Sequence, residues 1–301
     1  MRNFCLSCCS TVDLNPEWMK KRDLRYVCFR YTLDGTEYLD DMGVSMPSEE
    51  LFRRMSGGAQ TKTSQVSVEE YIAHFERMLA EGLDVLHVTL STGLTGTYNA
   101  ACIARDELKE RYPERKLYIV DSLGASSGYG LIMETLADLR DQGKTIDELR
   151  DWPEANKLRM HHWFFSTDLS FYVRGGRISK AAGMVGTMLN ICPLLNMDAE
   201  GHLAPREKLR GKRRVIQRIV EQMEAHAEGG LDYSGKCFMC QSLCPEDARA
   251  VADLVEERFP RLQGKVEIFP IGTTIGSHTG PGTVALFFWG STRADRQECG
   301  Q

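Results

Sequence analysis

Hydrophobic and polar positions alternate between two periods along the first half of the chain. Apolar residues at 71, 72, 75, 78 and 79 share one helical face, and Glu81-Gly82 is expected to end that helix. A short apolar run at 84–90 is typical of a buried strand. Helical and strand patterns then repeat as helix 96–111, strand 116–121 and helix 126–139. This repetition predicts a parallel sheet with right-handed crossovers.

The pattern becomes mixed after Trp152-Pro153-Glu154, where we expect a domain boundary. Two of the later strands are expected to be joined by a turn at 198–201. The strands expected in this part are 161–166, 191–196, 202–209, 236–242, 265–271 and 283–289, and the helices are 169–182, 212–224 and 246–258. The sequence therefore predicts an α/β protein with a parallel-sheet domain at 1–155 and a mixed α+β domain at 156–301.

The amino-acid composition argues against some classes of binding partner. The 301 residues are 42% hydrophobic, and 37 basic against 42 acidic side chains give a net charge of −5. This balance argues against binding to nucleic acid or to anionic membranes, which requires excess Lys and Arg. No apolar run approaches the roughly 20 residues needed to span a bilayer, and the first residues do not follow the signal-peptide pattern. We expect a cytoplasmic protein.

Ten cysteines are present, and three of them have a spacing that suits a metal site. Cys237, Cys240 and Cys244 have this spacing, and a fourth thiolate would come from the Cys5/Cys8/Cys9 cluster. However, the segment around Cys237 is expected to be a strand, whose successive side chains alternate between faces. Cys237 and Cys240 would then point in opposite directions, so we expect no metal ion there.

Three loops combine glycine with hydroxyl residues near predicted strand ends: 91–97, 121–130 and 275–282. Glycines let the backbone approach a ligand closely, and free N–H groups at a helix start favour an anion. In the third loop, His278 between hydroxyl residues is a suitable donor for a carboxylate or phosphate. The structural alternatives are a Thr-capped turn for the first loop and a structural histidine for the third.

The second loop also matches the G-x-S-x-G pattern of serine hydrolases around Ser126. The order Ser126, Asp168, His278 would suit a catalytic triad. The first glycine of the motif comes only three positions after the end of the strand, and no HGGG-type oxyanion segment is present. A serine esterase or thioesterase is therefore kept as an alternative function.

Taken together, the motifs resemble those of the DegV family, whose members include the fatty-acid-binding subunits of bacterial fatty acid kinase. The matching pieces follow the family's order along nearly the whole chain. They are residues 10–14, 38–41, 62–65, 91–98, 121–122, 174–179, 208–210 and 275–282.

The resemblance implies a doubly wound N-terminal domain and a smaller mixed C-terminal domain, with a long-chain fatty acid between them. It implies that Thr63, Thr92, Gly93 and His278 hold the carboxylate. It also implies that Arg177 and Arg210 lie near the carboxylate mouth and the partner, a separate kinase that forms the acyl phosphate. On this interpretation the chain is a carrier without a cofactor, not an enzyme, and touches membranes only transiently for lipid exchange.

Two positions depart from the family pattern. Cys9 stands where the family has Asp, so the first strand is expected to be altered. Thr92 replaces a Ser, keeping the hydroxyl group and adding a methyl group.

Simple energetics favour a fatty acid. Each buried methylene contributes about 0.8 kcal/mol, so a C16 tail offers roughly 12 kcal/mol before the costs of binding. Apolar segments such as 164–165, 184–189 and 286–289 are candidates for the tunnel wall. A third possible function is a small-carbonyl-binding kinase subunit similar to the dihydroxyacetone kinases, in which His278 would bind substrate.

Overall fold

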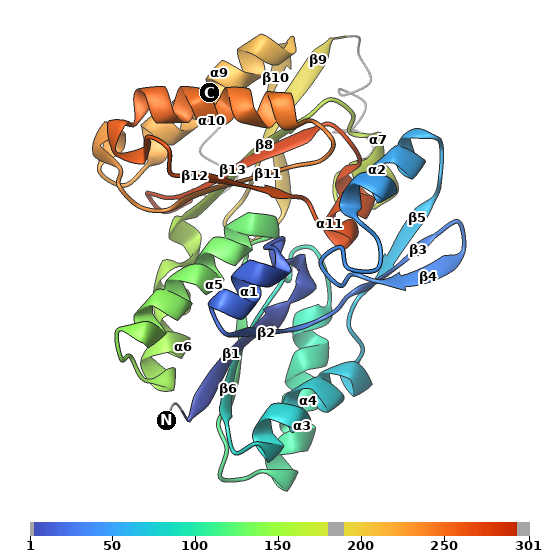
Figure 1. Cartoon of the computed structure of the whole chain (residues 1–301), viewed down its shortest axis with the longest axis vertical. Helices are drawn as coiled ribbons and strands as arrows, with labels where there is room; N and C mark the ends of the chain where they lie inside the picture. Colours follow the sequence, from blue (N-terminus) through green and yellow to red (C-terminus); the bar gives the residue numbers. More distant parts are fainter. Residues whose placement is uncertain (1–2, 180–189, 294–301) are drawn as a thin grey trace.

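The computed structural model describes residues 3–179 and 190–293, and it contains one parallel and one mixed sheet (Figure 1). The predicted α/β class is confirmed. The apolar segment 184–189 and the end of the helix predicted at 169–182 lie outside the described residues. The boundary between residues 155 and 156 stays a prediction, and Trp152-Pro153-Glu154 lies inside helix α6 (Ile146–Asn156).

The parallel sheet has the strand order β2-β1-β6-β7, formed by Leu24–Val27, Phe4–Cys9, Asp84–Thr89 and Leu117–Asp121. The chain runs outward from β1 to β2 and later returns past β1 to β6, so the direction of winding reverses between β1 and β6. In open α/β sheets, ligands bind beyond the carboxyl ends of the strands at such a switch point.

The expectation of an altered first strand is wrong. Strand β1 is regular and central, and it pairs in parallel with both β2 and β6. Cys9 is fully buried against Tyr71, whose hydroxyl group lies 3.3 Å from the Cys9 sulfur. A small apolar thiol fits this position in a strand that is buried on both faces.

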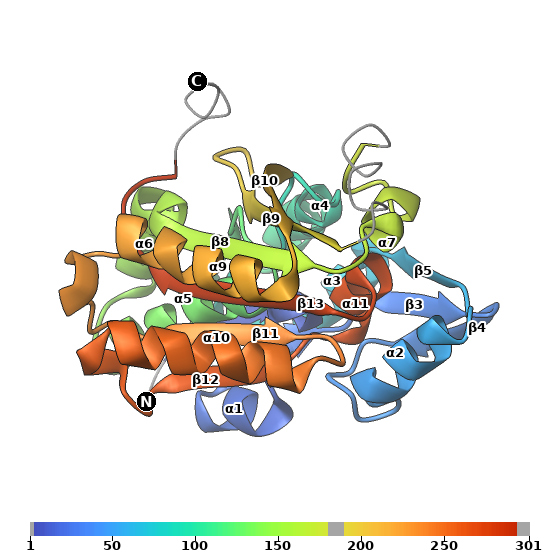
Figure 2. The same cartoon turned by 90° about the horizontal axis from the view of Figure 1, so that it is seen from above.

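The mixed sheet has the order β10-β9-β8-β13-β11-β12. Its strands are Leu203–Arg210, Ile191–Met197, Met160–Ser166, Thr283–Trp289, Cys237–Gln241 and Val266–Pro270. Helices α9 (Lys212–His226) and α10 (Pro245–Arg258) lie side by side over one face (Figure 2). Cys237 belongs to the core on that face and Cys240 to the core on the other face, as the strand period predicts.

Helix α5 (Ser126–Asp141) fills the space between the two sheets, and twelve of its sixteen residues are buried. Two glycines allow this close packing. A Cβ atom on Gly128 would lie 2.5 Å from the Phe287 ring in β13, and one on Gly130 would lie 2.7 Å from the Val12 carbonyl oxygen. The other helices of this part are α1 (Pro16–Lys21), α3 (Val68–Ala80) and α4 (Thr97–Arg111).

A small antiparallel sheet, absent from our predictions, has the order β4-β3-β5, from Thr36–Leu39, Arg30–Leu33 and Thr61–Ser64. It lies with helix α2 (Ser48–Ser56) beside helix α11 (Thr273–Thr279) (Figure 1). Because α11 extends to Thr279, much of the third predicted loop (275–282) is helical, although Thr, Ile and Gly are weak helix formers. Tertiary contacts explain the difference, because a Cβ atom on Gly276 would lie 2.6 Å from the Phe52 ring.

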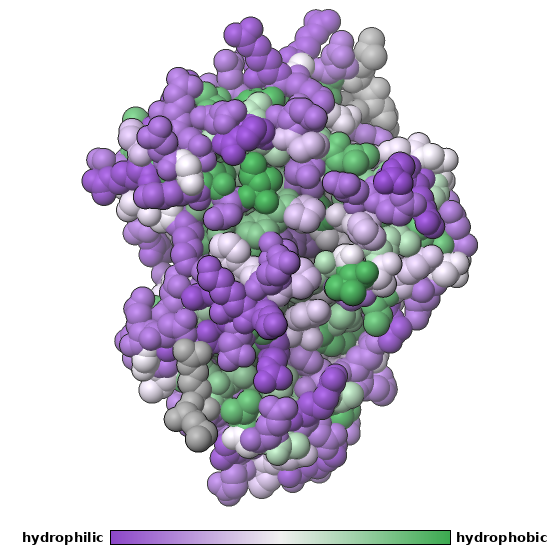
Figure 3. All heavy atoms as spheres, viewed as in Figure 1, coloured by the Kyte–Doolittle hydropathy of each residue, from purple (hydrophilic) through white to green (hydrophobic). Residues whose placement is uncertain are grey.

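The surface seen in Figure 3 is mostly hydrophilic, with small separate apolar areas. None of the helices formed by residues 3–179 and 190–293 has the length and apolar character needed to cross a bilayer.

A buried polar cluster between the parallel sheet and α3 makes the stability depend on pH. Ser7 Oγ lies 2.7 Å from His74 Nε2 and 2.9 Å from His87 Nδ1. Burial, with a smaller contribution from nearby arginines, lowers the pKa of His74 from 6.5 to about 4. The folded protein thus holds His74 neutral while the unfolded chain takes up a proton below pH 6.5, so stability is lost as the pH falls from 6.5 towards 4.

We expect His74→Gln to lower the slope of unfolding free energy against pH by about 1.4 kcal/mol per pH unit within that window. Urea denaturation at several pH values measures this slope. His202→Gln, at a half-exposed histidine of the 198–201 turn, is the control. An equal slope in wild type and His74→Gln would contradict this assignment.

Candidate functional site

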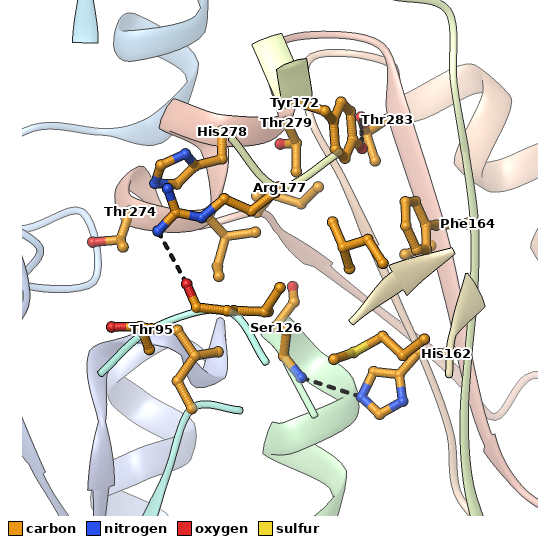
Figure 4. A pocket seen from close by; sticks show the side chains of 18 of the residues that line it. Thr95, Ser126, His162, Phe164, Tyr172, Arg177, Thr274, His278, Thr279 and Thr283 are labelled. Atoms are coloured by element: carbon orange, nitrogen blue, oxygen red, sulfur yellow. Dashed lines mark hydrogen bonds between the residues drawn. The ribbon is translucent and has the colours of Figure 1, made fainter. Parts of the chain in front are cut away.

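A cavity of about 320 Å³ lies beyond the carboxyl ends of β6 and β7, between the parallel sheet and the mixed sheet (Figure 4). One group of its residues comes from the loops that follow β2, β6 and β7, and the others come from β5, α7 (Ser170–Arg174), β8 to β13 and α11. The lining is Phe29, Thr63, Gln65, Leu90, Leu94, Thr95, Gly96, Ala125, Ser126, His162, Phe164, Tyr172, Arg177, Met197, Leu203, Cys240, Ile271, Thr274, Ile275, His278, Thr279, Thr283, Ala285 and Phe287.

Several of the polar groups lie together on one side of this cavity. Figure 4 shows Arg177 and His278 close together there, with Thr95 and Thr274 on the same side. His278 Nε2 and Thr63 Oγ1 lie 2.8 Å apart and share a hydrogen bond. Arg177 donates to the carbonyl oxygens of Leu94, at 3.1 Å, and Gly175.

His278 is neutral at pH 7, because burial, with a smaller contribution from Arg177, lowers its pKa to about 4. Its Nδ1 atom is buried and has no hydrogen-bond partner among the residues that the structure describes. The backbone of Gly175 packs against this atom so closely that a Cβ atom would lie 2.3 Å away. Gly175 therefore fixes the position of the imidazole ring.

The other side of the cavity is largely apolar and carries Phe164 (Figure 4). The ring of Phe287 packs there against His162, with 5.3 Å between the ring centroids. His162 also lies there, but its two nitrogens are already used. Nδ1 donates to the Met160 carbonyl oxygen at 3.1 Å, and Nε2 accepts from the Ala125 N–H at 3.3 Å. Burial lowers the pKa of His162 well below 6.5, so this ring is a neutral part of the wall.

The structure brings Thr63, His278 and Arg177 together at the cavity, whereas Thr92 and Gly93 do not line it. Thr92 donates its hydroxyl group to Asp121 Oδ2 at 2.5 Å. Gly93 donates its N–H to Ser91 Oγ at 3.1 Å and packs against the backbone of Gly201. These contacts hold the loop after β6 against β7 and the β9–β10 turn, and a role of Thr92 and Gly93 at the ligand stays a prediction.

Arg210 also lies away from the cavity. It is exposed at the end of β10 and lines a separate surface pocket with Arg213, Arg214 and Arg218. Arg210 and Arg177 therefore do not lie together at one opening of the cavity.

Two polar residues of the cavity were missed by the sequence analysis. Gln65 lies two residues beyond Thr63, and the alternation of a strand would have placed both side chains on one face. Thr274 has a buried hydroxyl group for which residues 3–179 and 190–293 offer no hydrogen-bond partner. It lies in α11, where we predicted no regular element.

The serine hydrolase alternative is not supported by the surroundings of Ser126. This residue has a φ of 55°, the left-handed backbone also found at nucleophile elbows, but its hydroxyl group donates to Asp13 and lies 3.1 Å from the Cys240 sulfur. Asp168 instead accepts hydrogen bonds from Ser170. His278 contacts Thr63, so the three residues do not form a triad.

Comparisons with known proteins cover nearly the whole chain. The family described as "Uncharacterised protein, DegV family" matches residues 9–290. A DegV domain-containing protein of Clostridium perfringens is 33% identical over 97% of this chain and 99% of its own length.

Comparison with solved structures also finds DegV family proteins. A DegV family protein from Thermus thermophilus, described for its fatty acid binding, has a TM-score of 0.84 and 26% identity, over 97% of this chain and 100% of that one. The fatty acid kinase B3 protein of Streptococcus pneumoniae, loaded with linoleic acid, shares the fold with a TM-score of 0.82 and 22% identity, over 97% of this chain and 100% of that one.

A fluorophosphonate probe should leave Ser126 unlabelled, because no histidine activates its hydroxyl group. We expect Ser126→Ala to lower stability by about 1–3 kcal/mol, since it leaves buried Asp13 Oδ2 without its donor. Mass spectrometry of the labelled protein and urea denaturation measure the two effects. Stoichiometric labelling of Ser126 would restore the hydrolase interpretation.

Proposed function

Because the chain belongs to the DegV family, we propose that it binds a long-chain fatty acid in the cavity and presents the carboxylate to a separate kinase. The observation that carries the proposal is the division of one cavity into a cluster of donors and an apolar wall. We further propose a cytoplasmic carrier, since acyl-phosphate formation requires a kinase and ATP.

The donors suit a carboxylate, which only accepts hydrogen bonds. With its single hydrogen on Nε2, neutral His278 donates to Thr63 Oγ1 and leaves the Thr63 hydroxyl hydrogen free to point into the cavity. The buried hydroxyl group of Thr274 is a second donor. The guanidinium group of Arg177 supplies the positive charge that a partly buried carboxylate requires.

The apolar wall suits the acyl tail. Aromatic and branched side chains from the mixed sheet, including Phe164, Phe287 and Leu203, face the loop residues Leu90 and Leu94 of the parallel sheet. Burying methylenes between these two sets provides about 0.8 kcal/mol per group, which the polar end alone cannot supply.

We expect Thr63→Val to weaken fatty-acid binding by about 1–3 kcal/mol, because it removes a donor and keeps the side-chain shape. Titration of delipidated protein with a C16 or C18 acid measures the affinity. Thr61→Val is the matched control, because Thr61 lies on the same strand but donates to the Ser277 carbonyl oxygen at 3.2 Å. The head-group assignment is wrong if the two variants bind equally well.

A basic surface is proposed as the docking site for the kinase. Arg210, Arg213 and Arg214 are exposed around the start of α9, and the described part of the chain offers them no acidic partner within ion-pair distance. The neighbouring Arg218 pairs with Glu207 and Glu221. Unpaired arginines steer an acidic partner and raise the rate of association.

We expect Arg210→Ala to slow acyl-phosphate formation and leave lipid affinity unchanged, whereas Arg177→Ala should weaken lipid binding itself. The assay combines the loaded protein, a fatty acid kinase and ATP, with acyl hydroxamate detection over a salt series. Lipid affinity is measured in parallel. Turnover of Arg210→Ala at the wild-type rate at low salt would exclude this surface as the docking site.

A further inference from the structure

Two motifs of the sequence take almost no part in the fatty-acid cavity. The segments 10–14 and 38–41 meet instead at a second cavity of about 290 Å³. This cavity lies between the loop after β1, the segment that joins β4 to α2, and the start of α11. Its lining is Ser10, Asp13, Leu14, Asn15, Asp40, Met42, Gly43, Pro47, Ser48, Glu49, Pro270, Gly272 and Thr273.

Two buried carboxylates lie on the wall of the second cavity. Asp40 is 1% exposed and accepts hydrogen bonds from Ser10 Oγ at 3.1 Å and Thr273 Oγ1 at 2.9 Å. Asp13 is 4% exposed, and its Oδ2 atom accepts from Ser126. The other oxygen of Asp13, Oδ1, is buried and has no hydrogen-bond partner in the described part of the chain.

Gly272 lets Asp13 Oδ1 approach the backbone closely. A Cβ atom at this position would lie 2.4 Å from Asp13 Oδ1 and 3.7 Å from Asp40 Oδ1. The two oxygens therefore flank the same point, and any larger side chain there would fill it.

The charges around this cavity have one sign. Glu49 adds a third acidic side chain, and Lys, Arg and His are missing from the described residues of the lining. An uncompensated buried carboxylate is unfavourable unless a cation or a proton neutralises it.

We propose that the second cavity is a binding site for a hard divalent cation, Mg²⁺ or Ca²⁺, with the carboxylates of Asp13 and Asp40 as its protein ligands. Such ions prefer oxygen ligands and keep bound water where the protein offers few of its own. The lining offers carboxylate and hydroxyl oxygens without His or Cys, and its volume leaves room for coordinated water.

The competing interpretation is that both carboxylates only anchor α11 and α5. It accounts for Asp40, which has donors on both oxygens, and for Asp13 Oδ2. It does not account for the buried Asp13 Oδ1, for which the described residues provide no donor.

Calorimetric titration of the full chain with MgCl₂ and CaCl₂, at neutral pH, tests the proposal. We expect one ion per chain and an affinity that falls at least about tenfold in Asp13→Asn and in Asp40→Asn. Asp41→Asn is the matched control and should bind as wild type, because Asp41 accepts from the Ser45 N–H outside the lining.

A second measurement uses the wild type alone, in case the Asp13 and Asp40 variants do not fold. Affinity should fall as the pH falls, because protons compete with the ion for the carboxylates. The proposal is overturned by the absence of heat up to about 10 mM metal, which is about tenfold above the roughly 1 mM dissociation constant of the weakest natural calcium sites. It is equally overturned by metal binding that does not depend on pH, or by unchanged binding in Asp13→Asn. Stabilisation of the folded protein by the organic cation methylammonium, but by neither metal, would also overturn it. These readouts do not involve the fatty acid, so their failure leaves the proposed lipid function intact.

Discussion

Helix α5 packs against both sheets at once, and two glycines set the distance between the layers. Gly128 faces β8 and β13, where His162 and Phe287 would overlap a Cβ atom, and Gly130 faces Val12 beside β1. Larger residues in this helix would push the mixed sheet away from the parallel sheet. The first cavity is lined by Ala125 and Ser126 at the start of α5 and lies between the same two layers, so its width depends on this packing.

The same helix start separates the two cavities. Ser126 lines the first cavity, and its hydroxyl group donates to Asp13, which lines the second. Neighbouring residues of α11 divide in the same way, with Thr274 in the first cavity and Thr273 in the second. The left-handed backbone of Ser126 is held by these contacts, which explains an elbow-like conformation without hydrolase chemistry. The starts of α5 and α11 therefore separate the two cavities and contribute residues to both of them.

The periodic elements were predictable from the sequence because each buries one face or both. Helices α3 and α9 and strands β6, β8 and β13 follow apolar spacings that require no knowledge of their neighbours. Helix α11 could not be predicted in this way, since Phe52 and Asp40, more than two hundred residues earlier, stabilise its weak helix formers. Thr92 shows the corresponding limit for the site. Its hydroxyl group suits a ligand, but Asp121 at the end of the adjacent strand accepts it, and sequence spacing does not reveal that competition.

Burial divides the roles of the two basic side chains in the first cavity. It lowers the pKa of His278 to about 4, and the nearby guanidinium group of Arg177 opposes a second positive charge. Burial also lowers the pKa of Arg177, but from so high a value that the group stays charged at pH 7. Arg177 thus provides the fixed charge, while His278 serves as a neutral hydrogen-bonding partner of Thr63. A ligand with a carboxylate neutralises the charge of Arg177, whereas an ester or an alcohol of the same length would bury the guanidinium group without neutralising its charge. The polar end of the cavity should therefore select ligands by charge, and the apolar wall should select them by the length of their chain. A carrier of free fatty acids would require both kinds of selection.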